Sequence, residues 1–431
     1  MSALCYLYFV ILTYVGINLL YKPHGIIKSP FNPRVLLKCT GCELFFVFII
    51  STGIIGLQPL LAVRLAMLEF LCIVALYKVP QKPVFSISLV FFLLFLLWIF
   101  IGLSYTTSVQ YGVRMILKYI YPLLIALLAS SIVRDVELFI KPTIWARRLA
   151  ILGFIVYSVP FLSFLSGGAF WHRAALATHC EIISIVSLTF AFYTKEKIKN
   201  VLLFVVTAII PFLWVFRTNI MELMVGVSVF FFMKYHIKSL PVILLMAVAS
   251  VASIFYIPAV KEKMFFNPEK VTLEKYIKGE IDDDDVNTSG RKFLWDDISS
   301  QFEKHPIIGN GTGFVQHRFY EVYTGWRKGG QLHNDMLVIL TDNGIIGFIL
   351  YVLATFGVFV HCFVVYRMKK YGNPIKMLAL IAGPTTVAVF LTMYSDNTLT
   401  YSMCTLSYPW GFYGMMLGLI KSKKYTIIEA C

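Results

Sequence analysis

The sequence has few charged residues. Only 14% of its 431 residues are charged and 58% are hydrophobic, with a mean hydropathy of +0.77. About a quarter of the residues in soluble domains are charged, so this composition excludes a soluble protein. Apolar runs of about 18 to 22 residues recur along the chain, and each is long enough to cross a bilayer core of roughly 30 Å. The composition therefore predicts a polytopic helical membrane protein.

The first apolar run lacks the positively charged start of a cleavable signal. The stretch from Met1 to Leu20 contains no Lys or Arg, and the first basic residue is Lys22. The run is also long, which favours a retained transmembrane helix.

Cysteine is absent from the one long polar segment, between Ala259 and Leu332, so that segment has no disulfide framework. Cys39 and Cys42 form a single CxxC pair without a second pair or a neighbouring His. Structural zinc sites usually need four such ligands, so no metal site is predicted.

The apolar segments predict an all-α polytopic fold with about thirteen transmembrane helices, within a range of 12–14. They lie at residues 3–21, 41–57, 60–77, 84–104, 113–133, 149–165, 179–194, 200–216, 218–233, 239–258, 344–366, 376–393 and 403–420. Three parts follow: a transmembrane bundle at 1–258, a polar loop with short helices at 259–343, and a second transmembrane part at 344–431.

Basic residues gather on alternating connections between these segments. The basic connections and tail hold Lys22, Lys28, Arg34, Lys38, Lys78, Lys82, Arg134, Lys141, Arg147, Arg148, Lys195, Lys197, Lys199, Lys234, Lys238, Arg367, Lys369, Lys370, Lys376, Lys421, Lys423 and Lys424. By the positive-inside rule they face the cytoplasm, which puts the N-terminus and the polar loop outside. The same rule explains most of the net charge of +15, so nucleic acid is not an expected partner.

Five basic residues lie at or near the outer ends of the predicted spans, against this rule: Arg64, Arg114, Lys118, Arg173 and Arg217. An Arg in mid-membrane costs about 2.5–3.5 kcal/mol on insertion scales, and less near a helix end. One interpretation is that each side chain extends to the lipid headgroups. The other is that together they bind an anion such as a lipid pyrophosphate, because Arg forks match phosphate oxygens.

The polar loop contains two patterns that invite binding hypotheses. The acidic run from Asp282 to Asp285 could hold a divalent cation, but consecutive carboxylates diverge, and a solvated linker is favoured. The glycines Gly309, Gly311 and Gly313 lack the Lys-Ser/Thr of a nucleotide loop and follow no strand. A nucleotide site is therefore excluded, and a turn is predicted. Between these patterns, residues 289–303 are predicted to form an amphipathic helix with Ser289 as N-cap.

His333 and Asn334 are predicted to open a short helix at the outer membrane surface. The residues Asp342-Asn343-Gly344 should then break the chain before the next span. A lone His is often structural. A catalytic role is favoured here because His333 falls at a helix start on the same side of the membrane as the stray cations.

Several of these residues resemble the O-antigen ligase and O-antigen polymerase superfamily. The resemblance is carried by Arg291 with Leu294-Trp295, by the Pro306–Gly313 segment, by His333-Asn334-x-x-Leu337 and by the Asn343–Gly347 segment. It implies a GT-C-like glycosyltransferase of the bacterial inner (cytoplasmic) membrane, with one large periplasmic loop and its active site on the periplasmic side. It further implies a donor glycan linked to undecaprenyl diphosphate and no cofactor, nucleotide sugar or metal.

The resemblance also implies roles for individual residues. His333 would activate or position the acceptor hydroxyl, and Arg217 would bind the diphosphate, with Phe216 where the family often has Ser. Arg173 resembles an earlier loop arginine of the family. Arg291 is expected in the catalytic set, while Arg114, Lys118, Arg64 and Asn334 are expected to bind the diphosphate or glycan.

Three functions remain open. A polymerase would extend the glycan on a second lipid-linked unit, with the bilayer and a chain-length regulator protein as further partners. A ligase would transfer the glycan to lipid A–core. The segment Ser395-Asp396-Asn397-Thr398-Leu399 favours the O-antigen and exopolysaccharide polymerases. A transporter or flippase would show internal repeats, and none is evident in the sequence.

Overall fold

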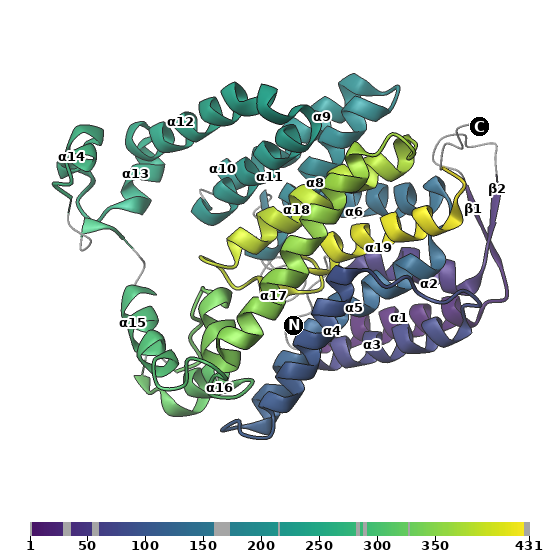
Figure 1. The fold of residues 1–431 in the computed structure, drawn as a ribbon, viewed down its shortest axis with the longest axis horizontal. Helices are drawn as coiled ribbons and strands as arrows, with labels where there is room; N and C mark the ends of the chain where they lie inside the picture. The colour runs from purple at the N-terminus through teal and green to yellow at the C-terminus, as the bar shows by residue number, and fades with distance from the viewer. Residues whose placement is uncertain are drawn as a thin grey trace.

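The computed structural model describes residues 2–28, 36–53, 60–158, 173–213, 216–281, 285–287, 291–325 and 328–425. The chain is built almost entirely of helices (Figure 1). The helices are α1 (Ser2–Tyr21), α2 (Gly41–Thr52), α3 (Leu61–Lys78), α4 (Ile87–Gly102), α5 (Val109–Ile132), α6 (Val136–Ser158), α8 (Arg173–Tyr193), α9 (Lys197–Ala208), α10 (Ile210–Leu213), α11 (Arg217–Tyr235), α12 (Leu240–Tyr256), α13 (Pro258–Met264), α14 (Leu273–Ile277), α15 (Arg291–Phe302), α16 (Phe314–His317), α17 (Asp335–Arg367), α18 (Asn373–Thr392) and α19 (Ser407–Ser422).

Wherever the structure describes a predicted apolar segment, that part of the segment is largely helical. By length and hydropathy, five helical stretches of the described residues can cross a membrane: Val109–Ile132, Leu176–Tyr193, Arg217–Tyr256, Asp335–Arg367 and Asn373–Thr392. The Arg217–Tyr256 stretch comprises α11 and α12, joined by a short 3-10 turn. The all-helical membrane architecture is therefore confirmed in outline, and the number of spans stays a prediction.

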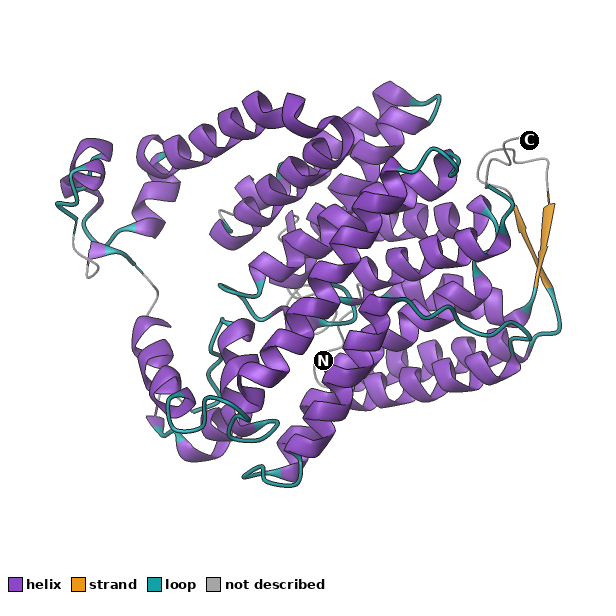
Figure 2. Cartoon of the chain, viewed as in Figure 1, coloured by secondary structure: helices purple, strands orange, loops and turns teal. Residues whose placement is uncertain are grey.

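One connection departs from the all-α expectation. Strands β1 (Gly25–Lys28) and β2 (Leu36–Cys39) pair antiparallel, with Ile26 opposite Lys38 (Figure 2). Each strand has only four residues, too few to give a readable alternation in the sequence. Ser289, most of the aspartate run and residues 159–172 lie outside the described residues, so the predictions made there are not addressed.

Connections that were assigned to one side of the membrane meet at one end of the bundle. Arg134 donates a hydrogen bond to the carbonyl oxygen of Gly418 at 3.0 Å, and Asp135 accepts one from the hydroxyl of Tyr425 at 2.8 Å. The amide of Gly372 donates to the carbonyl oxygen of Tyr425 at 2.7 Å. Figure 1 shows the β1–β2 hairpin at this same end and α15 with α16 at the opposite end. The connections at Asp135 and Gly372 and the tail at Tyr425 therefore meet at one end, as the charge pattern requires, and their side of the membrane stays a prediction.

An aromatic core holds α4, α5, α17 and α19 together. The Phe92 ring lies 4.7 Å from that of Trp410, and the Phe95 ring lies 5.0 Å from Tyr119 and 5.2 Å from Tyr351. All five side chains are buried. Tilted and edge-on aromatic pairs add about 0.5–1.5 kcal/mol each beyond their buried area. This core anchors α17, whose first turn follows His333.

The glycine-rich segment is a structural turn. Gly309, Gly311 and Gly313 all have positive φ, at 81°, 96° and 86°. The backbone N–H groups of Gly313 and Val315 donate to the Asp342 carboxylate at 2.8 and 2.9 Å. The turn therefore encloses an acidic side chain of α17, and these two amides are already used within the protein.

The break predicted near Gly344 is confirmed. Gly344 interrupts α17 with φ 65° and ψ −174°, and the amide of Ile345 donates to the carbonyl oxygen of Pro306 at 2.8 Å. The polar loop is thus bonded directly to the bend.

Replacing Gly344 with alanine is expected to leave little folded protein. An added Cβ would lie 2.2 Å from the carbonyl oxygen of Ile307. The positive φ costs about 1–3 kcal/mol, and overpacking adds about 1–3 kcal/mol. Thermal unfolding in detergent measures the loss. Gly279→Ala is the matched control, because Gly279 has φ +71° with nothing within 4 Å of the added Cβ. Equal melting temperatures for the two variants would contradict the prediction that the added Cβ at position 344 collides with the Ile307 carbonyl group.

Candidate functional site

His333 lies just before α17. The helix begins at Asp335, and Asn334 is its N-cap, with Oδ1 accepting from the amide of Leu337 at 2.9 Å. The expectation that His333 itself opens the helix is therefore off by two residues. His333 has a φ of 52°, a left-handed conformation that costs a non-glycine residue roughly 1–2 kcal/mol. The surrounding contacts must hold this strained backbone in place.

Two residues of the segment after α18 hold His333. The backbone amide of His333 donates to Oδ1 of Asn397 at 2.9 Å, and its ring Nδ1 lies 3.2 Å from Oδ1 of Asp396. Asn397 Nδ2 lies 3.1 Å from the same Nδ1 and donates to Gln331 Oε1 at 2.6 Å. The imidazole is thus positioned by a segment more than sixty residues further along the chain.

The charge on Asp396 determines which nitrogen of the imidazole carries the proton. Burial acts to raise the pKa of Asp396, but hydrogen bonds from His333 and from the amide of Asn397 outweigh it and lower that pKa. An ionised carboxylate can only accept, so Nδ1 must donate to it. The lone pair of the neutral ring is then on Nε2. The His333 side chain is 35% exposed, so this nitrogen can meet a substrate.

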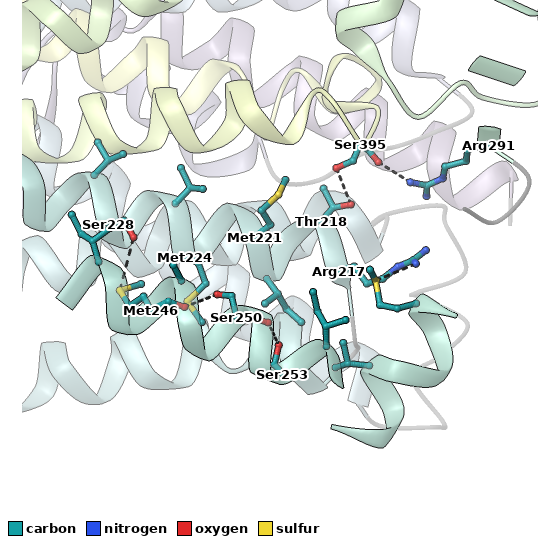
Figure 3. Close-up of a pocket in the computed structure, with 18 residues that line it drawn as sticks. Arg217, Thr218, Met221, Met224, Ser228, Met246, Ser250, Ser253, Arg291 and Ser395 are labelled. Carbon is teal, nitrogen blue, oxygen red and sulfur yellow. Dashed lines mark hydrogen bonds between the residues drawn. The ribbon is translucent and has the colours of Figure 1, made fainter. Parts of the chain in front are cut away.

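A long apolar cavity of ≈ 610 Å³ lies between α11 and α12. It is lined by Arg217, Thr218, Ile220, Met221, Met224, Val225, Ser228, Val229, Ile243, Met246, Ala247, Ser250, Ser253, Ile254, Val260, Met264, Arg291 and Ser395. Figure 3 shows Arg217 and Arg291 at one end, with Ser228 and Met246 towards the other. The cavity therefore combines an apolar channel with a strongly cationic mouth.

Backbone carbonyl groups hold the two arginines at this mouth. Arg217 Nη1 donates to the carbonyl oxygens of Lys263 and Asn287, both at 2.9 Å, and Arg291 Nη1 donates to that of Ser395 at 2.8 Å. Burial lowers the pKa of Arg291, and the charge of Asp396 opposes that effect. These carbonyl oxygens fix the direction of both guanidinium groups. The two cations lie near enough to repel each other, an arrangement that an anion would relieve.

The structure separates the remaining predicted cations. Arg64 is packed in the interior, 2% exposed, and donates to the carbonyl oxygen of Thr52 at 3.1 Å. Arg114 is exposed on α5, over the Tyr111 ring at 5.0 Å. Arg173 begins α8, and its side chain lies outside what the structure describes. Of the four such residues whose side chains the structure describes, only Arg217 lines the large cavity, while Lys118 lines a second, smaller one.

Three residues of the site were missed as site residues by sequence reasoning: Ser395, Asp396 and Asn397. Ser395 lines the cavity mouth, Asp396 contacts the His333 ring, and Asn397 bonds the His333 amide. The available signal was a polar Ser-Asp-Asn run between two apolar segments, since polar groups at membrane ends are frequently functional.

The fold and site define a multi-pass helical membrane protein with a histidine–carboxylate pair beside the cationic mouth of a large apolar cavity. Residues 182–352 match a family model described as O-antigen ligase. The match spans Arg217, Arg291 and His333 and supports the O-antigen polymerase and ligase superfamily, so the resemblance of the sequence is confirmed. Proteins of this family are glycosyltransferase-like enzymes that act on lipid-linked glycans in membranes. A comparison with curated proteins gives no match for the chain.

Proposed function

We propose that this protein is an inner-membrane polysaccharide polymerase of the Wzy type. It would join oligosaccharide repeat units linked to undecaprenyl diphosphate into O-antigen or exopolysaccharide on the periplasmic face. One observation carries the proposal: the residues that hold His333 continue directly into Ser395 at the two-arginine mouth of the apolar cavity.

The cavity suits a lipid diphosphate as donor. Its apolar walls on α11 and α12 match an isoprenoid chain, and small-molecule sites are usually apolar with a few placed polar groups. Arg217 and Arg291 would bind the diphosphate at the mouth, because guanidinium groups pair with phosphate oxygens bidentately.

The transfer needs one base and one stabilised leaving group. The acceptor hydroxyl passes its proton to Nε2 of His333, and its oxygen attacks the anomeric carbon of the donor. The bond from that carbon to the diphosphate oxygen breaks, and the electron pair leaves with the diphosphate. Arg217 and Arg291 stabilise the negative charge that develops there. The products are an elongated lipid-linked glycan and free undecaprenyl diphosphate, with the anomeric centre inverted.

Reconstitution tests this proposal. The purified protein in lipid nanodiscs receives lipid-linked repeat units extracted from a strain in which this gene is deleted. We expect longer lipid-linked glycans without added nucleotide sugar.

In the deletion strain itself, core with a single repeat unit identifies a polymerase, whereas bare core with accumulated lipid-linked polymer identifies a ligase. Movement of the glycan across sealed vesicles without elongation would identify a transporter.

Asp396→Asn is expected to reduce turnover while keeping the fold. The amide preserves size but removes the charge that sets the imidazole tautomer, a change that costs about 10⁴ in kcat in a serine-protease triad. The pKa of Asp396 is lowered, so its carboxylate stays charged at any pH at or above the usual pKa of an Asp side chain. The carboxylate becomes protonated, and stops holding the His333 ring, only when the pH falls below that usual pKa. The wild type should therefore lose activity as the pH falls below that usual pKa, whereas the variant should be slow at every pH. An unchanged profile would limit Asp396 to a structural role.

A further inference from the structure

A second, smaller cavity lies next to the residues that hold His333 and shares no lining residue with the cavity at Arg217. Its volume is ≈ 60 Å³, and α5, α16 and the turns before α17 and after α18 form its walls. Its lining contains Met115, Lys118, Val315, Gln316, Phe319, Tyr320, Gly330, Gln331, Leu332, Asp335, Val338, Asn397, Leu399 and Thr400. Unlike the cavity at Arg217, it is rich in groups that form hydrogen bonds.

One group that lines this cavity has no hydrogen-bond partner among the described residues. Oε1 of Gln316 is buried and accepts no hydrogen bond from the described residues. Leaving a buried acceptor unsatisfied is costly, so native proteins rarely do so without a ligand or water to supply the donor. Gln316 also lines the cavity, so a turn of its amide would present this acceptor to an external hydroxyl or amide donor.

The charges in the cavity nearly balance. Lys118 Nζ lies 3.8 Å from the sulfur of Met115, within electrostatic reach of the buried carboxylate of Asp335. Asp335 Oδ2 accepts from Thr398 Oγ1 at 3.0 Å and from the amide of Leu399 at 2.8 Å. One cation beside one anion favours a neutral ligand that both donates and accepts, as a hydroxyl does.

The size and the aromatic wall favour part of a sugar ring. A single water needs about 10–15 Å³, so ≈ 60 Å³ accepts a few hydroxyl-sized groups and not a whole oligosaccharide. Tyr320 stacks on Tyr111 with ring centroids 5.8 Å apart and remains partly exposed, which provides an apolar face beside the amides.

Asn397 places this cavity on the acceptor side of His333. Its side chain bonds the His333 amide, contacts the ring Nδ1 and lines the small cavity, while Ser395, two residues earlier, lines the mouth of the large one. Three consecutive residues, Ser395, Asp396 and Asn397, therefore connect the donor cavity, the His333 ring and the small cavity in that order.

We propose that this small cavity binds hydroxyl groups on one edge of an uncharged sugar at the non-reducing end of the acceptor glycan. The residues that make the contacts are Lys118, Gln316, Tyr320, Gln331, Asn397 and Thr400. The proposal rests on the function proposed above, and it assigns the acceptor to a site separate from Arg217 and Arg291.

The test uses an acceptor that cannot be a donor. Mild acid frees the repeat-unit oligosaccharide from its lipid diphosphate, and a fluorophore is attached at its reducing end. The full-length protein in nanodiscs is then assayed for binding of this probe by fluorescence anisotropy, and for its elongation at a fixed concentration of lipid-linked donor. Gln316→Leu and Lys118→Met are compared with Gln301→Leu on α15, which lines neither cavity.

We expect Gln316→Leu to weaken probe binding and raise the KM for the probe by about five-fold, the effect of one lost hydrogen bond. Lys118→Met should act in the same direction, while the KM for the lipid-linked donor stays unchanged in both. Gln301→Leu should behave as wild type. Unchanged binding in both cavity variants, or an equal rise in both KM values, would overturn the acceptor assignment.

The two proposals fail in different ways. If wild type binds the probe and the cavity variants do not, yet no glycan is elongated, the sugar site stands and the polymerase function is wrong. If wild type elongates glycans but the folded Gln316→Leu and Lys118→Met variants bind the probe normally, the function stands and the site is wrong.

Discussion

Replacing His333 with alanine is expected to abolish glycan elongation while leaving folded protein in the membrane. The variant loses the Nε2 lone pair that would accept the acceptor's proton, and positioned general bases contribute about 10²–10⁴ in rate. The fold should survive, because the neighbouring structural bonds belong to Asn334, which caps α17, and to Asp335. Relief of the positive φ is not expected, since alanine has the same backbone restriction as histidine.

The measurement is the length distribution of the glycan in a deletion strain that carries each variant, with membrane content followed by immunoblot. His305→Ala is the matched control, because His305 is an exposed histidine of the same polar loop. A normal ladder from His333→Ala would remove His333 from the mechanism. A short ladder from both variants would indicate a general requirement for the loop.

Replacing Arg291 with alanine should lower kcat/KM for the lipid-linked donor by on the order of 10²–10³, the usual effect of removing one group that stabilises a developing negative charge. Arg291 is held by one carbonyl bond, to Ser395, whereas Arg217 bonds two carbonyl groups of the polar loop. Arg217→Ala should therefore lose both activity and stability. Arg291→Ala therefore tests the stabilisation of the diphosphate charge with less loss of fold stability than Arg217→Ala.

Arg291→Lys separates charge from geometry. Lysine retains the cation but not the planar fork, so activity between those of alanine and wild type would support bidentate phosphate binding. Arg114→Ala is the matched control, since Arg114 is an exposed cation of α5 that lines neither cavity. An Arg114→Ala variant as impaired as Arg291→Ala would restore the original hypothesis of a broad cationic face.

The sequence predicted the helices and the bend at Gly344 because these depend on local patterns. Apolar length defines a membrane helix, and Asp-Asn-Gly is a turn signal. The short β1–β2 pairing was missed, since pairing joins residues on two separate segments, such as Ile26 and Lys38. The grouping of stray cations was predicted only in part. The distribution of charge along the sequence shows which end of a helix a residue occupies, but not which side of the helix it faces. The side of the helix is what distinguishes buried Arg64 from Arg217, which lines the cavity.

What the sequence determined by itself was the membrane class, the one long polar segment and His333 within it, together with the family resemblance. All of these are properties of contiguous residues. What only the tertiary structure decided was which groups surround His333. Asp396 and Asn397 contact it, Ser395 continues to the mouth of the large cavity with Arg217 and Arg291, and Asn397 also lines the small cavity. These groups come from α5, α11, α15 and the segments flanking α17 and α18. Only the packing of those helices brings residues so distant in the chain into one region, and it places Asp396 and Asn397 within hydrogen-bonding distance of His333.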